Sequence, residues 1–401
     1  TTGARATAAP GSGAHATASS VAGMTKSAFT VLRCHDRVAH AGRTADGIRT
    51  GDRLRRRSCV STVKDILLRT AEFLAERGVD QPRLEAELLL GHALDKARMD
   101  LYLSFDQPLV DTELAALRPL VRRRANREPL YWILGRKGFH DIELLCHSAV
   151  LVPRSDTEAL VEAVLQRLPT TFDGFVADVG SGTGALGLAL AAARPGIKVY
   201  ATDVSPAALA NTRANVAALG LSSRVGVLEG PLLTPVPAGR PIDIVVSNPP
   251  YIPSDHIARL DAEVGQHEPR LALDGGRDGL DIYRALLPRA ARRARIGVAV
   301  EIGHDQGPAV ADLFRRAGLA DVQVLPDLAG RDRVVLGRNP ASRWPREPPV
   351  PHPASGERTV EPVAPAPVAA PGAEAVVVLD TVPDTSAVDE RGQPLPVFIR
   401  D

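Results

Sequence analysis

The stretch that decides the fold is GFVADVGSGTG, at residues 174–184. Its first six residues are mostly β-branched, aromatic or small, which predicts a short buried strand, and the apolar run ALGLALAAA at 185–193 predicts a helix. Glycine permits positive φ and lets a ligand approach the backbone, and the first N–H groups of a helix attract negative groups. We therefore expect the intervening loop to bind a cofactor through Gly180, Ser181, Gly182, Thr183 and Gly184.

Two carboxylates near this loop bear on the choice of cofactor. Asp178 lies near the end of the first strand. Asp203 ends the next strand, where a carboxylate accepts hydrogen bonds from ribose hydroxyls. The spacing from Gly182 to Gly187 also fits the dinucleotide motif G-x-G-x-x-G. A nicotinamide dinucleotide and S-adenosylmethionine both fit these residues, and we favour S-adenosylmethionine, with Asp178 meeting its ammonium group.

Strand-like and helix-like segments alternate from about residue 150 onward. We expect strands at 174–179, 198–202, 224–228, 242–246, 296–301 and 332–336. We expect helices at 156–167, 185–193, 205–219, 280–293 and 305–317. This alternation indicates an α/β fold with a largely parallel sheet covered by helices on both faces. Ligands of such sheets bind beyond the carboxyl ends of the strands, where each motif falls.

A second motif, Asn248-Pro249-Pro250-Tyr251, follows the expected strand at 242–246. Proline fixes φ and lacks an N–H, so the carbonyls of Asn248 and Pro249, with the Asn248 side chain, form rigid acceptors for both hydrogens of an –NH2 group. Tyr251 can pack against the planar group that carries this nitrogen. These hydrogen bonds return electron density to the nitrogen, and positioning in line with a sulfonium methyl does the rest. The motif predicts methyl transfer to an amide or aromatic amine, with no metal and no dedicated base.

The composition limits the classes of protein to consider. The 401 residues allow two or three domains. Lys and Arg number 48 against 47 Asp and Glu, a formal charge of +1, which argues against a protein that grips nucleic acid over its whole surface. There is no apolar run of about 18 residues that would span a membrane. The three cysteines are too scattered for a disulfide framework or metal cage, which favours a reducing compartment.

We divide the chain into five segments. Residues 1–60, rich in Arg, Ser and Thr, are expected to be a disordered or misannotated extension. Residues 340–401 hold 13 of the 33 prolines and are expected to be a disordered tail. Between them we expect a small helical bundle at 61–126, a connecting segment or hairpin at 127–149, and the α/β domain at 150–339.

Three helices are expected in the bundle. The Ser-Thr pair at 61–62 can cap the first, and Pro82 can begin the second, which should end before Gly91. The third starts near Asp111 and should be kinked or shortened at Pro119. We expect the basic cluster at its end to be solvated: Arg122, Arg123, Arg124 and Arg127. In the α/β domain, Glu301 at the end of a strand is expected to hydrogen-bond loop backbone.

With these residues in place, the chain resembles the HemK/PrmC family of protein-glutamine N5-methyltransferases, which act on peptide-chain release factors. The resemblance covers about residues 62–339, and its most specific parts are EPLYWILG at 128–135, with Phe139, and VPRSDTE at 152–158. It continues through 178–184, Asp203, 248–251, 268–280, 301–306 and 330–334.

The resemblance implies a seven-stranded, Rossmann-like class I methyltransferase domain that depends on S-adenosylmethionine, behind a helical bundle that recognises the substrate. The glycine loop, Asp203 and Asn248 would hold the cofactor. Adenine would rest on backbone or on Leu232, because Gly230-Pro231 offers no side-chain acceptor. The substrate-binding residues it implies are Asn248, Pro249, Pro250, Tyr251, Phe139, Pro153, Arg154 and Glu158.

The resemblance further implies that the target is the glutamine of a Gly-Gly-Gln loop in class 1 release factors. It leads us to expect a cytoplasmic monomer with no membrane attachment and no stable binding to nucleic acid. An alternative reading stays open, because nucleic acid methyltransferases use the same turn on adenine N6 or guanine N2. Such enzymes must extract a base from its stack and usually carry a basic domain, whereas this chain is nearly neutral.

Overall fold

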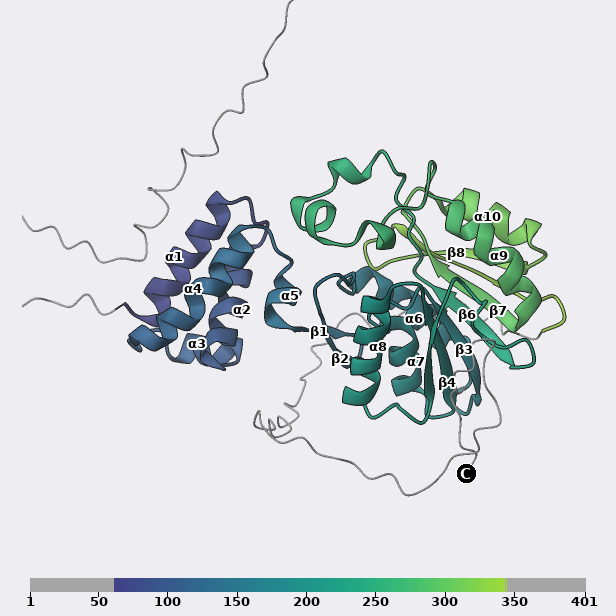
Figure 1. Ribbon diagram of the computed structural model, residues 1–401, viewed down its shortest axis with the longest axis horizontal. Helices are drawn as coiled ribbons and strands as arrows, with labels where there is room; N and C mark the ends of the chain where they lie inside the picture. Colours follow the sequence, from purple (N-terminus) through teal and green to yellow (C-terminus); the bar gives the residue numbers. More distant parts are fainter. Residues whose placement is uncertain (1–60, 343, 345–401) are drawn as a thin grey trace, which may run out of the picture.

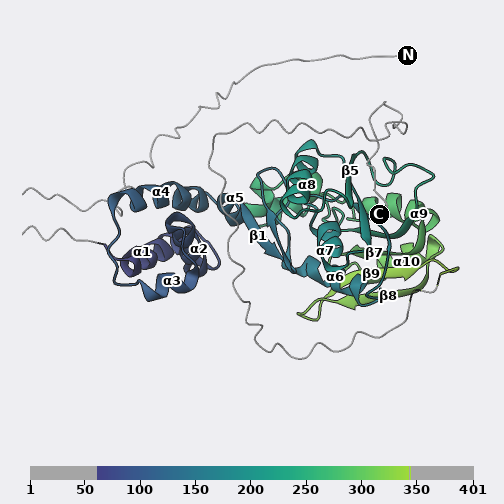
Figure 2. The ribbon, with the colours of Figure 1, turned by 90° about the horizontal axis from the view of Figure 1, so that it is seen from below.

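The computed structural model describes residues 61–342 and 344. A bundle of helices lies beside an α/β domain, with α5 and β1 between the two in both views (Figures 1 and 2). The expectations for residues 1–60 and for 345–401 concern residues outside the described ranges. Within those ranges, no helix is both long and apolar enough to cross a membrane.

Four helices form the bundle, and α5 leads out of it. Their bounds are α1 (Val63–Glu76), α2 (Pro82–Leu94), α3 (Arg98–Leu103), α4 (Asp111–Ala125) and α5 (Leu130–Leu134). Thr62 caps α1, as expected, because its hydroxyl accepts from the Asp65 N–H at 3.2 Å while the Asp65 carboxylate accepts from the Thr62 N–H at 3.1 Å. Buried leucines and valines of α1, α2 and α4 then close one core.

The bundle departs from expectation at three points, the first being α3, a fourth helix that the sequence analysis did not predict. Gly91 does not end α2, which continues to Leu94. A Cβ at Gly91 would lie 2.7 Å from the Lys96 carbonyl oxygen, so glycine permits a close approach of the chain there. Pro119 does not shorten α4, which runs on to Ala125. It stands on the exposed side of the helix, where water can satisfy the carbonyl that loses its partner.

The α/β domain is built on one seven-stranded sheet, as the sequence pattern and the resemblance predict. Its strands are β3 (Gly174–Val179), β4 (Ile197–Asp203), β5 (Val225–Glu229), β6 (Ile242–Ser247), β7 (Ala294–Glu301), β8 (Ala320–Pro326) and β9 (Asp332–Arg338). Their order is β5-β4-β3-β6-β7-β9-β8, parallel except for β9, which runs antiparallel to both of its neighbours. The sequence analysis missed β8, a half-buried edge strand that contains the positive-φ residue Asp321.

Helices cover both faces of this sheet. They are α6 (Glu158–Leu165), α7 (Ala185–Ala193), α8 (Pro206–Ala218), α9 (Asp281–Arg293) and α10 (Gly307–Arg316). Successive residues of a strand face opposite layers: Val176 packs in the core under α6 and α7, and Ala177 in the core under α9 and α10. Trp344 also packs in the first core and is 5% exposed, so the packed chain extends past residue 339.

A small hairpin connects the bundle to the sheet domain. Its strands β1 (Arg136–Phe139) and β2 (Ile142–Leu145) pair antiparallel, outside the main sheet. Asn215 of α8 accepts from the Leu145 N–H at 2.7 Å and donates to the Leu145 carbonyl at 3.2 Å. Asn211 donates to the same carbonyl at 2.9 Å. The hairpin is therefore fixed to the helix that also borders the glycine loop.

Candidate active site

Three strand ends bring the sequence motifs side by side. In the parallel register, Asp178 of β3 pairs with Ala201 of β4 and with Val246 of β6. Asp203 and Asn248 each come two residues later, so they reach the carboxyl edge of the sheet at the level of the glycine loop. The order of strands reverses between β3 and β6. The motifs therefore meet at the topological switch point, where ligands of such sheets bind.

The glycine loop has the backbone geometry that its sequence predicts. Gly180, Gly182 and Gly184 have φ values of 71°, 59° and 85°. A Cβ added to Gly180 or Gly182 would meet nothing within 4 Å, whereas one on Gly184 would lie 2.8 Å from Leu188 Cδ1. The first two glycines therefore leave bare backbone facing open space, and the third is required by helix packing.

Side chains of α8 hold this loop in place. The Thr212 hydroxyl donates to the Gly182 carbonyl at 2.9 Å, and Asn215 Nδ2 donates to the Thr183 carbonyl at 2.9 Å. Ser181 and Thr183 are themselves buried, so contact with a ligand falls to the loop backbone. The sequence analysis missed Thr212 and Asn215. The available signal was a set of polar residues in the apolar run of α8, but sequence alone names no partner for them.

The two carboxylates differ in their surroundings. Both oxygens of the partly exposed Asp203 accept from backbone, from the N–H groups of Gly182 and Ser205, each at 2.9 Å. Asp178 is 1% exposed, and its Oδ2 accepts from the Gly187 N–H at 2.9 Å. Its Oδ1 is buried without a hydrogen-bond partner among the described residues. Burial raises the pKa of Asp178 to about 7, although the hydrogen bond from Gly187 opposes this.

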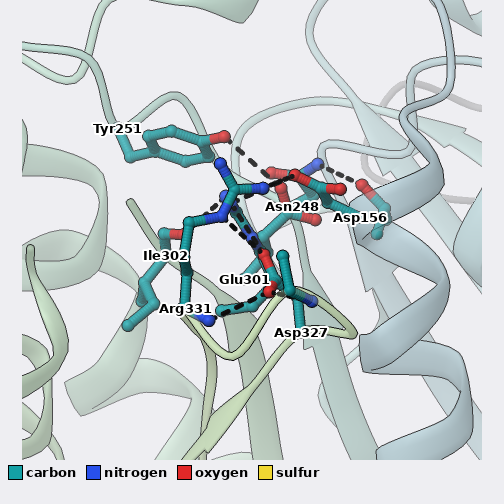
Figure 3. Close-up of polar contacts among 10 residues, drawn as sticks. Asp156, Asn248, Tyr251, Glu301, Ile302, Asp327 and Arg331 are labelled. Carbon is teal, nitrogen blue, oxygen red and sulfur yellow. Dashed lines mark hydrogen bonds and ion pairs between the residues drawn. The ribbon is translucent and has the colours of Figure 1, made fainter. Parts of the chain in front are cut away.

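The Asn-Pro-Pro-Tyr turn follows the end of β6 and carries backbone carbonyls that can accept hydrogen bonds from a ligand. Ser247, just before it, donates its hydroxyl to the Val179 carbonyl at 2.7 Å and ties the ends of β6 and β3 together. Asn248 Nδ2 donates to Thr157 Oγ1 at 3.1 Å (Figure 3). Among the described residues, nothing donates a hydrogen bond to the carbonyls of Asn248 and Pro249. The turn thus offers the carbonyl acceptors that the two prolines predict.

Tyr251 is held at both its backbone and its hydroxyl. Its carbonyl accepts from Gln306 Nε2 at 2.9 Å, and its hydroxyl donates to Glu301 Oε1 at 3.4 Å (Figure 3). Burial raises the pKa of Tyr251 well above its ordinary value and that of Glu301 to about 7. The expectation that Glu301 bonds loop backbone is wrong, because no backbone N–H of the described residues donates to its side chain. The carboxylate instead faces the tyrosine of the turn, while its own carbonyl accepts from the Tyr283 hydroxyl.

A buried arginine braces the segment that carries Thr157. Arg333 of β9 is 7% exposed and lies 3.1 Å from Asp156 and 3.3 Å from Asp327. It also donates to the Ile302 carbonyl at 3.2 Å. Asp327 accepts from the Arg331 N–H at 3.0 Å, so the turn between β8 and β9 belongs to the same group of contacts (Figure 3). The sequence analysis named none of these pairs, and the contact of Arg333 with Asp156 joins residues that lie far apart along the chain.

The other residues predicted to bind substrate or cofactor differ in their burial and in their contacts. Arg154 forms an ion pair with Glu268, a residue that is almost fully buried. Glu158 begins α6 and is partly exposed. Phe139 is 1% exposed within the core, which gives it a packing role, so its contact with a substrate stays a prediction. Leu232 has a φ of 53°, and its carbonyl accepts from the Thr202 hydroxyl at 2.8 Å.

The expectation of a solvated basic cluster is wrong for Arg124. Its side chain is 1% exposed and pairs with Glu85 of α2 and with Glu263 of the segment after the turn. Arg127 also reaches Glu263, at 2.9 Å. Both arginines pair with a carboxylate more than a hundred residues away along the chain. The prediction of a solvated cluster considered only the helix that carries them, so it could not include this partner. The bundle is thereby fixed to the Glu263–His267 segment, which follows the Asn-Pro-Pro-Tyr turn along the chain.

A seven-stranded sheet with a glycine loop and an Asn-Pro-Pro-Tyr turn at its switch point defines a methyltransferase. The family model for the PrmC N-terminal domain matches residues 65–135, and that for the methyltransferase small domain matches residues 155–263. In the described residues, no three His, Cys, Asp or Glu side chains group as they would around a metal ion.

The alignment with this chain covers nearly the whole length of several named relatives. The release factor glutamine methyltransferase of Moorella thermoacetica is 46% identical over 278 residues, which are 69% of this chain and 98% of the relative. That of Geobacter sulfurreducens is 44% identical over 279 residues, 69% and 96% of the two chains. The chain belongs to the release factor glutamine methyltransferase family. A solved release factor-specific protein-(glutamine-N5) methyltransferase from Alicyclobacillus acidocaldarius is 33% identical, with a TM-score of 0.29 over 47% of this chain and 94% of its own.

Proposed function

We propose that this protein methylates N5, the side-chain amide nitrogen of the glutamine in the Gly-Gly-Gln motif of class 1 release factors, with S-adenosylmethionine as methyl donor. The observation that carries the proposal is the Asn248–Tyr251 turn. Its carbonyl acceptors receive no hydrogen bond from the part of the chain that the structure describes, and it lies one strand away from the open glycine loop. We place the reaction in the cytoplasm, with the protein acting as a monomer.

The residues at the strand ends fit S-adenosylmethionine. Asp178 Oδ1 is a buried acceptor without a partner in residues 61–342 and 344, which suits an ammonium group nearby. Gly180 and Gly182 leave room beside their backbone for a ligand. Asp203 ends β4, where carboxylates receive ribose hydroxyls, and Leu232 can pack on the adenine. When bound, the cofactor supplies a methyl group on a positively charged sulfur.

The turn activates the target nitrogen by accepting its hydrogens. A carboxamide nitrogen is a poor nucleophile because its lone pair is delocalised into the carbonyl. Asn248 Oδ1 and the Pro249 carbonyl would receive the two N–H groups, which returns electron density to the nitrogen and fixes its direction of attack. Tyr251 would pack against the amide plane, with its hydroxyl already held by Glu301. The methylated nitrogen is strongly acidic and loses its proton without a dedicated base.

The release factor would bind at the surface around the Asn-Pro-Pro-Tyr turn and the segment that precedes α6. Arg154 and Glu158 lie on the segment between the hairpin and α6 and have partly exposed side chains that can meet a substrate loop. Pro250 is also partly exposed within the turn itself. A Gly-Gly-Gln loop has little side-chain bulk, so the glutamine can extend into a narrow site.

A methyl-transfer assay with radiolabelled S-adenosylmethionine tests this function. The substrates are a class 1 release factor, its Gly-Gly-Gln→Gly-Gly-Ala variant, a DNA duplex and ribosomal RNA. We expect label only in the release factor that retains the glutamine. Label in adenine or guanine, with none in the release factor, would instead establish the nucleic acid activity that uses the same turn.

A further inference from the structure

The amide of Asn248 can present either of two faces to a substrate. Its Oδ1 accepts hydrogen bonds and its Nδ2 donates them, and a half-turn about the side-chain bond exchanges the two. Only the acceptor face helps a target –NH2 group, since the donor face would repel its hydrogens. Some other group must therefore hold the Nδ2 end away from the substrate.

Thr157 occupies the Nδ2 side of this amide. It is 3% exposed, lies in the 3-10 turn Ser155–Thr157 before α6, and accepts from Asn248 Nδ2 at 3.1 Å (Figure 3). A threonine hydroxyl can also donate, however. The contact fixes the amide only if the single Thr157 proton is committed elsewhere.

Glu301 is the acceptor available for that proton. Its carboxyl is 1% exposed and accepts a hydrogen bond from the Tyr251 hydroxyl on Oε1, while Oε2 is buried and has no hydrogen-bond partner among the described residues. Interaction with the Thr157 hydroxyl is the leading influence that lowers the pKa of this carboxyl against its burial. Above its raised pKa of about 7 this carboxyl is mostly ionised and only accepts hydrogen bonds, so in that form it sets the direction of the hydroxyls that donate to it.

We propose that Thr157 and Glu301 are positioning residues, which orient the Asn248 amide so that Oδ1 faces the target nitrogen. Asn248 Nδ2 donates to the Thr157 hydroxyl, and in this proposal the Thr157 proton turns to Glu301, whose buried Oε2 has no hydrogen-bond partner among the described residues. Glu301 holds Tyr251 at the same time, so one buried carboxylate orders both side chains of the turn. This inference rests on the proposed function.

The test compares three variants of the full chain in methyl transfer to a release factor. Thr157→Val keeps the shape but removes the hydroxyl, Thr157→Ser keeps the hydroxyl, and Thr70→Val is a matched change at a buried threonine of α1. Thr157→Val should lower kcat about tenfold, with KM and the affinity for S-adenosylhomocysteine within about threefold. Thr157→Ser should restore kcat to within about threefold, and Thr70→Val should match the wild type.

A second measurement separates this inference from the proposed function. The side-chain NH2 signals of Asn248, assigned in NMR spectra through Asn248→Ala, should exchange slowly in the wild type and in Thr157→Ser but quickly in Thr157→Val. Glu301→Gln should lower kcat in the same direction and serves if Thr157→Val fails to fold. Unchanged kcat and exchange in Thr157→Val, or equal loss in Thr157→Ser, would overturn the inference. A wild type inactive on release factors would overturn the proposed function, and the exchange measurement would still decide the contact.

Discussion

Replacement of Arg124 by methionine tests how the helical bundle is fixed to the α/β domain. The guanidinium is 1% exposed and is shared between Glu85, which is 13% exposed, and Glu263, which is 28% exposed. It also donates to the Glu128 carbonyl at 3.2 Å. Methionine fills most of the volume of the stem but removes every one of these bonds.

The expected cost follows from what the substitution leaves behind. Glu85 loses the cation that it faces inside the protein, whereas Glu263 keeps Arg127 at 2.9 Å. Breaking a buried ion pair by removing one partner typically costs about 3–5 kcal/mol. Because one carboxylate keeps a cation and both reach some solvent, we expect the free energy of unfolding to fall by about 3 kcal/mol, at the lower end of that range.

Urea denaturation measures this loss as a shift of the midpoint at constant slope. Arg122→Met is the matched control, since Arg122 is exposed on the same helix, and it should change the free energy of unfolding by less than about 0.5 kcal/mol. Adding Glu85→Gln to Arg124→Met should recover part of the loss, because the unpaired charge is removed. A loss below about 1 kcal/mol, or one equal to that of the control, would refute the reasoning.

Three further predictions concern the active site. Asn248→Ala should lower methyl transfer at least about a hundredfold while cofactor affinity stays within about tenfold, and an unaltered rate would contradict the role of its amide. Asp203→Ala should weaken cofactor binding at least about tenfold by calorimetry, because it loses a ribose acceptor and a brace of the Gly182 N–H. The pKa of Asp178 is raised to about 7 in the free protein, and an ammonium group bound beside it would lower that pKa. Affinity should therefore fall as the pH drops below about 7, with a proton released on binding near neutrality, whereas Asp178→Asn should show neither effect.

Much of the α/β fold could be predicted from local pattern. The strand at 174–179 and the helix at 185–193 occupy the expected residues, because a β-branched run, a glycine loop and an apolar helix are all encoded within a few neighbours. The acceptors of Asn248 and Pro249 were predictable for the same reason, since proline acts on its own backbone. β8 escaped prediction because an edge strand is only half buried and its pattern is weak.

What only the tertiary structure decided is which distant groups meet. Thr157 and Asn248 are 91 positions apart, and Arg124 and Glu263 are 139 apart, yet each pair is in hydrogen-bond contact. The identity of either residue does not indicate its partner, because a hydrogen bond depends on where the folded chain places the two atoms. Four consecutive residues therefore determine the chemistry of the turn. The orientation of the Asn248 amide depends on packing between strands, turns and helices, which cannot be predicted from the order of residues in the sequence.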